Sequence, residues 1–200
     1  DMLAGFQNIF IAATLLVAVF MGCTFNAMNM ISEKENGVDL VNQVLPMTRS
    51  GYVMQKIFVG FIGGCLSAVL TALSYFRLPW GSAVWMLVLI MLSALNAALI
   101  GLLIGKFSES LMAGVVYIKI VMIIFMAVPL VSYLLAADGL LSVLCYLVPS
   151  SAAFEGIMKL ADSDMSVIAK DMLILMTHAI IWFLLYLSIS NWHKKPGNEK

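Results

Sequence analysis

Long uncharged segments alternate with short polar segments along the chain. No Asp, Glu, Lys or Arg occurs in four of these segments, and a fifth contains only one Lys: 2–32, 57–76, 78–105, 172–193 and 110–137. A helix needs about 20 apolar residues to cross the hydrocarbon core of a bilayer. The pattern therefore predicts five transmembrane helices, at about 5–31, 55–76, 83–105, 112–136 and 171–191.

Composition also indicates that lipid, not water, surrounds most of the chain. Of its 200 residues, 62% are hydrophobic and only 11% are charged, which leaves too little charged surface for a soluble domain. The formal net charge is zero, so no overall basicity points to nucleic acid as a partner. We predict an all-α integral membrane protein in the lipid bilayer, with a single transmembrane domain at 1–192 and a cytoplasmic tail at 193–200.

One further uncharged stretch, 139–154, is too short to span the bilayer and contains Pro149. Proline cannot donate a helical hydrogen bond, so a helix is expected to end or begin there. After it, Phe154, Ile157 and Met158 recur at helical spacing with charged residues between them, which is typical of an amphipathic interfacial helix. We predict a short re-entrant or interfacial segment at about 138–165; a poorly ordered loop is the alternative.

Lys and Arg residues set the expected orientation, because cytoplasmic loops are enriched in them. With the C-terminus inside, seven basic residues lie inside: Lys34, Arg49, Lys56, Lys106, Lys194, Lys195 and Lys200. Three lie outside: Arg77, Lys159 and Lys170. This orientation places the N-terminus outside, and because the sequence begins with Asp1, we expect an upstream span to be missing.

The most polar long segment, 31–56, joins the first two predicted spans on the cytoplasmic side. Ser32-x-x-Glu35 matches a capping box that would begin a new helix, and apolar residues then recur every three or four positions up to Pro46. The pattern predicts an amphipathic helix at about 33–46. Such a helix can lie in the lipid headgroups, or it can dock into a groove of a cytoplasmic partner; periodicity leaves both open.

No motif for covalent chemistry or metal binding is present. Gly101–Ser110 resembles a phosphate-binding loop but has one residue too few between its glycines, and no Ser or Thr comes directly after Lys106. The histidines and cysteines lack ligand spacing. The sequence therefore predicts no catalytic residue, no metal site and no cofactor bound by this chain.

Five polar residues lie within the predicted spans: Asn26, Asn29, Asn96, Lys119 and His178. Polar groups inside a membrane are costly and often mark a transport pathway. The asparagines and His178 can equally form hydrogen bonds between helices, and Lys119 can extend its ammonium group to the membrane surface.

Two pairs of glycines, Gly60 with Gly64 and Gly101 with Gly105, have the spacing that allows helices to approach closely. This spacing serves packing within one chain as readily as it serves dimerisation.

The run EKENGVDLVNQVLPMTRSGYVMQK resembles the cytoplasmic loop of type-2 ATP-binding-cassette exporter permeases. The matching positions are Glu33, Lys34, Glu35, Gly37, Pro46, Arg49 and Lys56. The chain departs from the family pattern at Val38, Asn42, Leu45 and Gln55. A second run resembles the family's extracytoplasmic re-entrant motif, at Pro149, Phe154, Glu155 and Gly156. The resemblance makes the five predicted spans the second to sixth of a six-span permease.

The resemblance implies a permease subunit of an exporter in the cytoplasmic membrane. The implied partners are a second permease, identical or different, and separate ATPase subunits that bind ATP and Mg²⁺. The 33–49 segment would be the coupling helix: Glu33 and Glu35 would pair with basic residues of the ATPase, and Val41 and Val44 would fill its groove. The alternatives are a stand-alone secondary transporter, a structural membrane protein and a membrane enzyme.

Overall fold

The computed structural model of the chain describes residues 2–38, 49–75, 80–135, 140–161 and 168–192. Every regular element in these ranges is an α-helix. The helices are α1 (Met2–Glu35), α3 (Arg49–Tyr75), α4 (Trp80–Phe107), α5 (Leu111–Leu134), α6 (Leu140–Cys145), α7 (Pro149–Ala161) and α8 (Ile168–Trp192). The prediction of an all-α fold is confirmed for this part of the chain.

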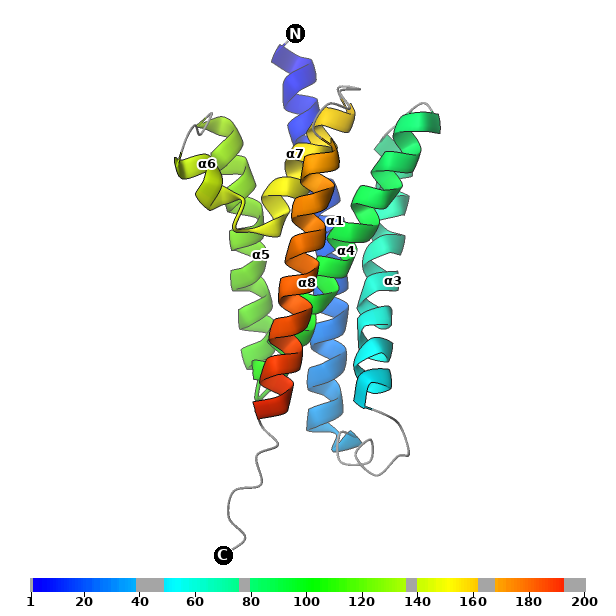
Figure 1. Cartoon of the computed structure of the whole chain (residues 1–200), viewed down its shortest axis with the longest axis vertical. Helices are drawn as coiled ribbons and strands as arrows, with labels where there is room; N and C mark the ends of the chain where they lie inside the picture. Colours follow the sequence, from blue (N-terminus) through cyan, green and yellow to red (C-terminus); the bar gives the residue numbers. More distant parts are fainter. Residues whose placement is uncertain (1, 39–48, 76–79, 136–139, 162–167, 193–200) are drawn as a thin grey trace, which may run out of the picture.

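Five of these helices, α1, α3, α4, α5 and α8, are long and apolar enough to cross a membrane. They correspond to the five predicted spans. They run roughly side by side, and successive long helices point in opposite directions (Figure 1). As a result, α1 and α4 end, and α3 and α5 begin, at one end of the bundle, which we call the Glu35 end.

Helix α1 lies inside the bundle and contacts α3, α4, α5 and α7, whereas α8 packs against α4 and α7. Glycines allow the closest of these contacts. A Cβ atom at Gly101 of α4 would lie 2.3 Å from the backbone oxygen of Cys23 in α1, and one at Gly60 would overlap Asn26. Gly64 and Gly105 also face α1, so the four glycines singled out in the sequence pack helices within this chain.

The predicted start of a separate helix at Ser32 is wrong. Helix α1 continues through this position to Glu35, and the Ser32 carbonyl accepts the Asn36 N–H at 3.0 Å as in a helix interior. The Asn36 side chain also donates to the Ser32 carbonyl and hydroxyl, so Ser32 is not available to cap a new helix. The rest of the predicted 33–46 helix lies outside the described residues from 39 onward.

Between α5 and α8 the chain forms a hairpin of two short helices, α6 and α7, at the other end of the bundle from Glu35, which we call the α7 end. Helix α6 leads toward the interior of the bundle and α7 leads back outward (Figure 1), the course expected of a re-entrant segment. Ten of the 13 residues of α7 are buried, including Pro149, Phe154 and Gly156. The apolar face of this amphipathic helix packs against α1, α4, α5 and α8, and its position at a membrane interface stays a prediction.

Candidate functional site

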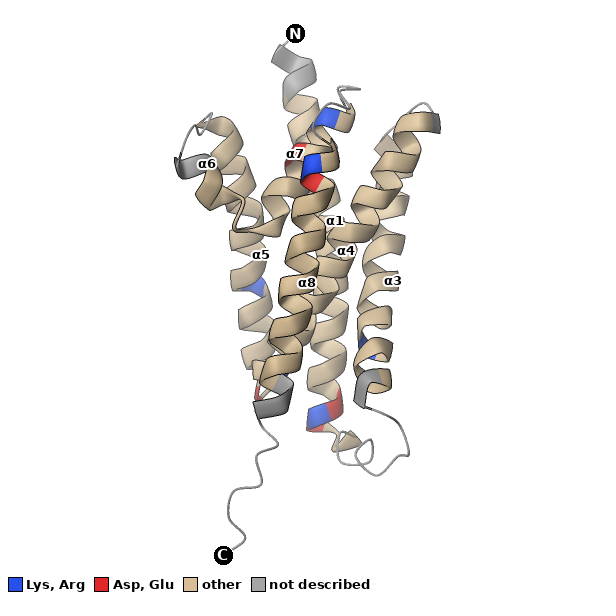
Figure 2. Ribbon diagram, viewed as in Figure 1, with Lys and Arg blue, Asp and Glu red and all other residues tan. Residues whose placement is uncertain are grey.

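Charged residues gather near the two ends of the bundle, and the long middle carries only Lys119 on α5 (Figure 2). At the Glu35 end, the predicted triplet Glu33, Lys34 and Glu35 occupies the last turn of α1. Successive residues of a helix point about 100° apart. The three side chains therefore leave α1 in different directions, and each reaches a different neighbour.

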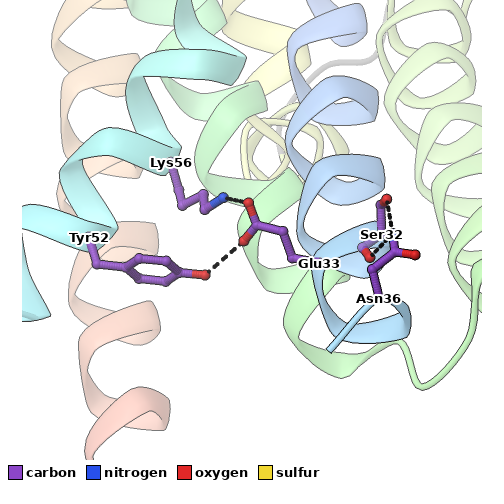
Figure 3. Close-up of polar contacts among 5 residues, drawn as sticks. All are labelled: Ser32, Glu33, Asn36, Tyr52 and Lys56. Atoms are coloured by element: carbon purple, nitrogen blue, oxygen red, sulfur yellow. Dashed lines mark hydrogen bonds and ion pairs between the residues drawn. The ribbon is translucent and has the colours of Figure 1, made fainter. Parts of the chain in front are cut away.

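Glu33 contacts α3. Its carboxylate forms an ion pair with Lys56, and its other oxygen accepts a hydrogen bond from the Tyr52 hydroxyl at 3.1 Å (Figure 3). The Lys56 ammonium group also lies 5.4 Å from the centre of the Tyr52 ring. The Lys56 side chain is only 8% exposed, so the pair is held where water screens it weakly.

Lys34 contacts the end of α4. Its ammonium group donates to the backbone oxygens of Gly105 and Lys106, both at 2.7 Å, and of Ser108 at 3.2 Å. The last carbonyls of a helix have no partner within the helix and carry partial negative charge. Lys34 therefore caps α4 with a cation that belongs to α1.

Glu35 contacts the start of α5. Its carboxylate accepts a hydrogen bond from the Leu111 backbone N–H at 2.7 Å, and the neighbouring Ser110 hydroxyl accepts one from Ala113 N–H at 3.3 Å. The first N–H groups of a helix carry partial positive charge, which matches a carboxylate. The three charges of the triplet thus connect α1 to α3, α4 and α5.

The chain turns away from α1 at Asn36 and Gly37. Gly37 has φ +69°, the left-handed conformation that commonly ends a helix, and its N–H donates to the Lys34 carbonyl at 3.2 Å. The glycine that the family resemblance singled out, Gly37, therefore suits the left-handed conformation that ends α1. Arg49 is the first residue of α3, whereas Val41, Val44 and Pro46 lie outside the described residues.

These contacts differ from those predicted for Glu33 and Glu35, whose expected partners were basic residues of the ATPase. Both carboxylates have partners inside the chain, because the last turn of α1 lies between α3 and the α4–α5 connection. Tyr52 and the capped backbone groups of α4 and α5 were not predicted from the sequence. No signal in a single sequence pairs Lys34 with carbonyls more than 70 positions away, whereas Tyr52, one turn before Lys56, could have been suspected.

The polar residues within the spans mostly form hydrogen bonds between helices. Asn26 on α1 donates to the Ala98 carbonyl of α4 at 2.9 Å, and Asn96 on α4 donates to the Leu175 carbonyl of α8 at 2.9 Å. His178 lies 2.9 Å from the Ile174 carbonyl and 3.1 Å from the Leu147 carbonyl before α7. Three residues thus fasten α4, α8 and the α6–α7 hairpin to the bundle.

Asn29 and Lys119 differ from these three residues. Asn29 is half-buried on α1, and Lys119 is exposed on the outer face of α5. Neither position by itself favours a role in a transport pathway. For Lys119, both a pathway role and extension of its ammonium group to the membrane surface stay open.

A second polar cluster lies at the α7 end. Glu155 on α7 is bonded to the Tyr146 hydroxyl and to Lys159, and Lys170 on α8 donates to Tyr146 at 3.1 Å. Beside it, Asp171 is fully buried, and its two oxygens have no hydrogen-bond partner among the described residues. Asp171 was not predicted as a site residue, although the sequence places this acid in the first turn of the last span.

The described residues contain no group of three His, Cys, Asp or Glu side chains able to hold a metal ion. Most of the hydrogen bonds and ion pairs described above cap helices or hold helices together. Five long apolar helices with charged ends define a multi-pass membrane protein.

A comparison with protein families narrows this class. The model of the family described as "ABC-2 family transporter protein" matches residues 3–187, so the chain belongs to this family. It is a non-catalytic transmembrane permease subunit of an ATP-binding-cassette transporter, and the resemblance seen in the sequence is confirmed. No curated protein and no solved structure matches the chain.

Proposed function

We propose that the chain is the permease of an exporter, and that ATP hydrolysis on a partner subunit drives it through the 33–49 segment. The family implies an ATPase partner in general terms. The observation that carries the proposal is the triplet Glu33, Lys34 and Glu35. Its three charges bind three different helices at the point where α1 gives way to residues 39–48.

The proposed mechanism follows from these contacts. Residues 39–48 dock on the ATPase, with Val41 and Val44 in its groove and Pro46 ending the docking element. A displacement of this segment moves the last turn of α1. The ion pair with Lys56 then acts on α3, while the caps on α4 and α5 move with the same turn. One mechanical input thus reaches four spans, as a change between two arrangements of the bundle requires.

The distribution of basic residues supports the proposed orientation, in which the chain lies in the cytoplasmic membrane and its Glu35 end faces the cytoplasm. Lys34, Lys56 and Lys106 lie at this end in the described part of the chain, whereas Lys159 and Lys170 lie toward the α7 end. The positive-inside rule favours this direction. The partners in the proposal are an ATPase that binds ATP and Mg²⁺, and a second permease. The placement of the five spans as the second to sixth of a permease stays a prediction.

Two variants separate docking from transmission. Val41→Asp is expected to weaken pull-down of the ATPase, because a charge in an apolar groove lacks a partner. Glu33→Gln is expected to leave pull-down unchanged but to lower permease-dependent ATP hydrolysis, because it removes the charge that pairs with Lys56. Glu109→Gln is the matched control, since Glu109 is an exposed glutamate at the same end.

The ATPase for these assays is the soluble protein with a phosphate loop that a neighbouring reading frame is expected to encode. If the ATPase hydrolyses ATP as fast with the Glu33→Gln permease as with the control, Glu33 has no part in transmission. If no such ATPase is encoded nearby and none is captured, a stand-alone secondary transporter becomes the better assignment.

A further inference from the structure

A groove runs between α4 and α5 in the half of the bundle nearer the Glu35 end. Its volume is about 420 Å³, which falls within the range of small-molecule sites in proteins. Two apolar stripes form its walls, at positions 100, 103, 104 and 107 of α4 and at positions 117, 120, 121 and 124 of α5, and Trp182 of α8 completes them. Both stripes have the spacing of one helix face, so the two helices turn matching faces toward this space.

The floor of the groove lies below the surface of the bundle. Ile100, Leu103 and Ile104 of α4 are 5%, 8% and 7% exposed. Tyr117 and Ile120 of α5 form the rim, at 44% and 49% exposed. Among the described residues, none with a charged side chain and no histidine lines the groove. A purely apolar space of this kind does not hold water well, and it binds apolar molecules instead.

The width of the groove limits what can lie in it. Each stripe covers seven residue steps of its helix, which is about 10 Å along the helix axis. Dividing the volume by this length gives a mean cross-section of about 40 Å². An α-helix with its side chains is about 10–12 Å across, a cross-section of about 80–110 Å². The groove therefore cannot enclose a further helix, whereas a hydrocarbon chain is thin enough to enter it.

The chemistry changes at the Glu35 end of the groove. Phe107 is the last residue of α4, and the preceding Lys106 holds its ammonium group 5.5 Å from the centre of the Tyr186 ring. Tyr186 lies one turn beyond the wall residue Trp182 on α8. The apolar space thus leads toward a cation. This order is complementary to a phospholipid, in which acyl chains lead to a negatively charged phosphate.

We propose that the groove binds one phospholipid from the leaflet at the Glu35 end, with an acyl chain in the groove and its phosphate at Lys106. The chain contacts α4, α5 and α8 together, which distinguishes it from lipid on the outer face of a single helix. It lies beside the two helices whose ends are capped by Lys34 and Glu35, so it influences how far α5 follows a movement of α1. That influence rests on the proposed function, whereas the binding does not.

Native mass spectrometry of the delipidated full chain in detergent tests the binding. The probe is dioleoylphosphatidylglycerol, and we expect one lipid to bind more tightly than all later ones. Ile120→Trp fills the groove and is expected to weaken this first step at least about five-fold, because the added ring overpacks the space. Ile123→Trp is the matched control, since Ile123 is exposed on the same helix but does not line the groove.

Dioleoylglycerol has the same acyl chains without a phosphate, and it tests the part of Lys106. The unaltered protein is expected to bind it about two- to five-fold more weakly than dioleoylphosphatidylglycerol, because a partly exposed ion pair contributes modestly. In Lys106→Met the two lipids are expected to bind equally. A difference that persists in this variant overturns the assignment of the phosphate to Lys106. Each comparison is made within one protein, so a loss of stability in the variant does not imitate the result.

Photolabelling of the unaltered chain in phosphatidylcholine nanodiscs removes any dependence on variants. The probe is a phosphatidylglycerol with a diazirine in one acyl chain, and tandem mass spectrometry locates the labelled residues. We expect labelling at 100–107 and 117–125 to exceed that at 112, 116 and 123, which are exposed on α5 outside the groove, by at least about five-fold, the factor expected for a modest binding preference.

Two results overturn the proposal. Labelling spread evenly over these positions means that only a non-specific layer of lipid surrounds the bundle. A dimer mass that is lost in Ile120→Trp but kept in Ile123→Trp means that a second copy of the chain occupies the groove. These experiments contain no ATPase, so a failure here is distinct from a failure of Val41→Asp to disturb docking.

Discussion

The cap that Lys34 forms on α4 can be measured through its removal. In Lys34→Met the aliphatic stem of the side chain is retained, and only the ammonium group with its bonds to three backbone oxygens is lost. The carbonyls at the end of α4 then lose a cation placed where the helix dipole favours one. The variant therefore isolates the charge and its hydrogen bonds from the packing.

The loss of stability expected in Lys34→Met follows from the geometry of the cap. Hydrogen bonds to a charged group contribute about 1.5–3 kcal/mol each, and a cation at a helix C-terminus adds about 0.3–1 kcal/mol. The three bonds share one half-buried ammonium group, so their contributions do not add in full. We expect the free energy of unfolding to fall by about 2–4 kcal/mol, which for a chain of this length corresponds to a Tm lower by about 5–15 °C.

The measurement is thermal unfolding of the purified protein in detergent, followed by tryptophan fluorescence. Lys119→Met is the matched control, because it makes the same substitution at a lysine that is exposed on α5. Its Tm is expected to stay unchanged or to rise, since a charge on an apolar surface has no role in holding the helices together. Equal Tm values for the two variants would refute the capping argument.

Two further predictions concern close packing and burial. Gly101→Ala is expected to lower the Tm by several degrees, since its Cβ would lie 2.3 Å from the Cys23 carbonyl oxygen and force α1 and α4 apart, at a cost of about 1–3 kcal/mol. Gly81→Ala serves as the control, because a Cβ there meets nothing within 4 Å. The same unfolding assay compares the two variants. Asp171→Asn is expected to raise the Tm or leave it unchanged near neutral pH, because it removes an unpartnered charge from a fully buried position; a lower Tm would mean that the carboxylate has a partner, and Glu109→Gln controls for loss of an exposed acid.

The five long helices and the break in the chain at Pro149 could be predicted because they follow from local properties. Length and apolar composition fix a membrane helix almost by themselves, and Pro149 marks the first residue of α7 because proline is tolerated at the start of a helix. Burial of α7 could not be predicted. Its Glu155 and Lys159 looked like the polar face of a surface helix, but they bond to each other, and Glu155 also accepts from Tyr146, which leaves the opposite face to pack inside the bundle.

The charged triplet is a second case in which a local pattern was visible in the sequence but its structural role was not. Its position next to a membrane helix was visible, and a capping box at Ser32 was a reasonable local interpretation. That motif satisfies the free N–H groups at the start of a helix, but the Ser32 N–H is already within a helix that began in the first span. Whether Ser32 starts or continues a helix is decided by the preceding 30 residues, which the four-residue motif does not contain.

The internal partners of Glu33 and Glu35 change what a mutation there can report. A charge that contacts the ATPase directly would act on the affinity between subunits. In the proposed mechanism, a charge that joins α1 to α3 or caps α5 would act instead on how far a displacement of the 39–48 segment travels into the bundle. The two effects are separable, because affinity appears in pull-down and transmission appears in hydrolysis at full occupancy. Since Lys56 is nearly buried with Glu33 as its ion-pair partner, reversing either charge alone should uncouple the subunits, whereas exchanging the two should restore part of the coupling without any change on the ATPase.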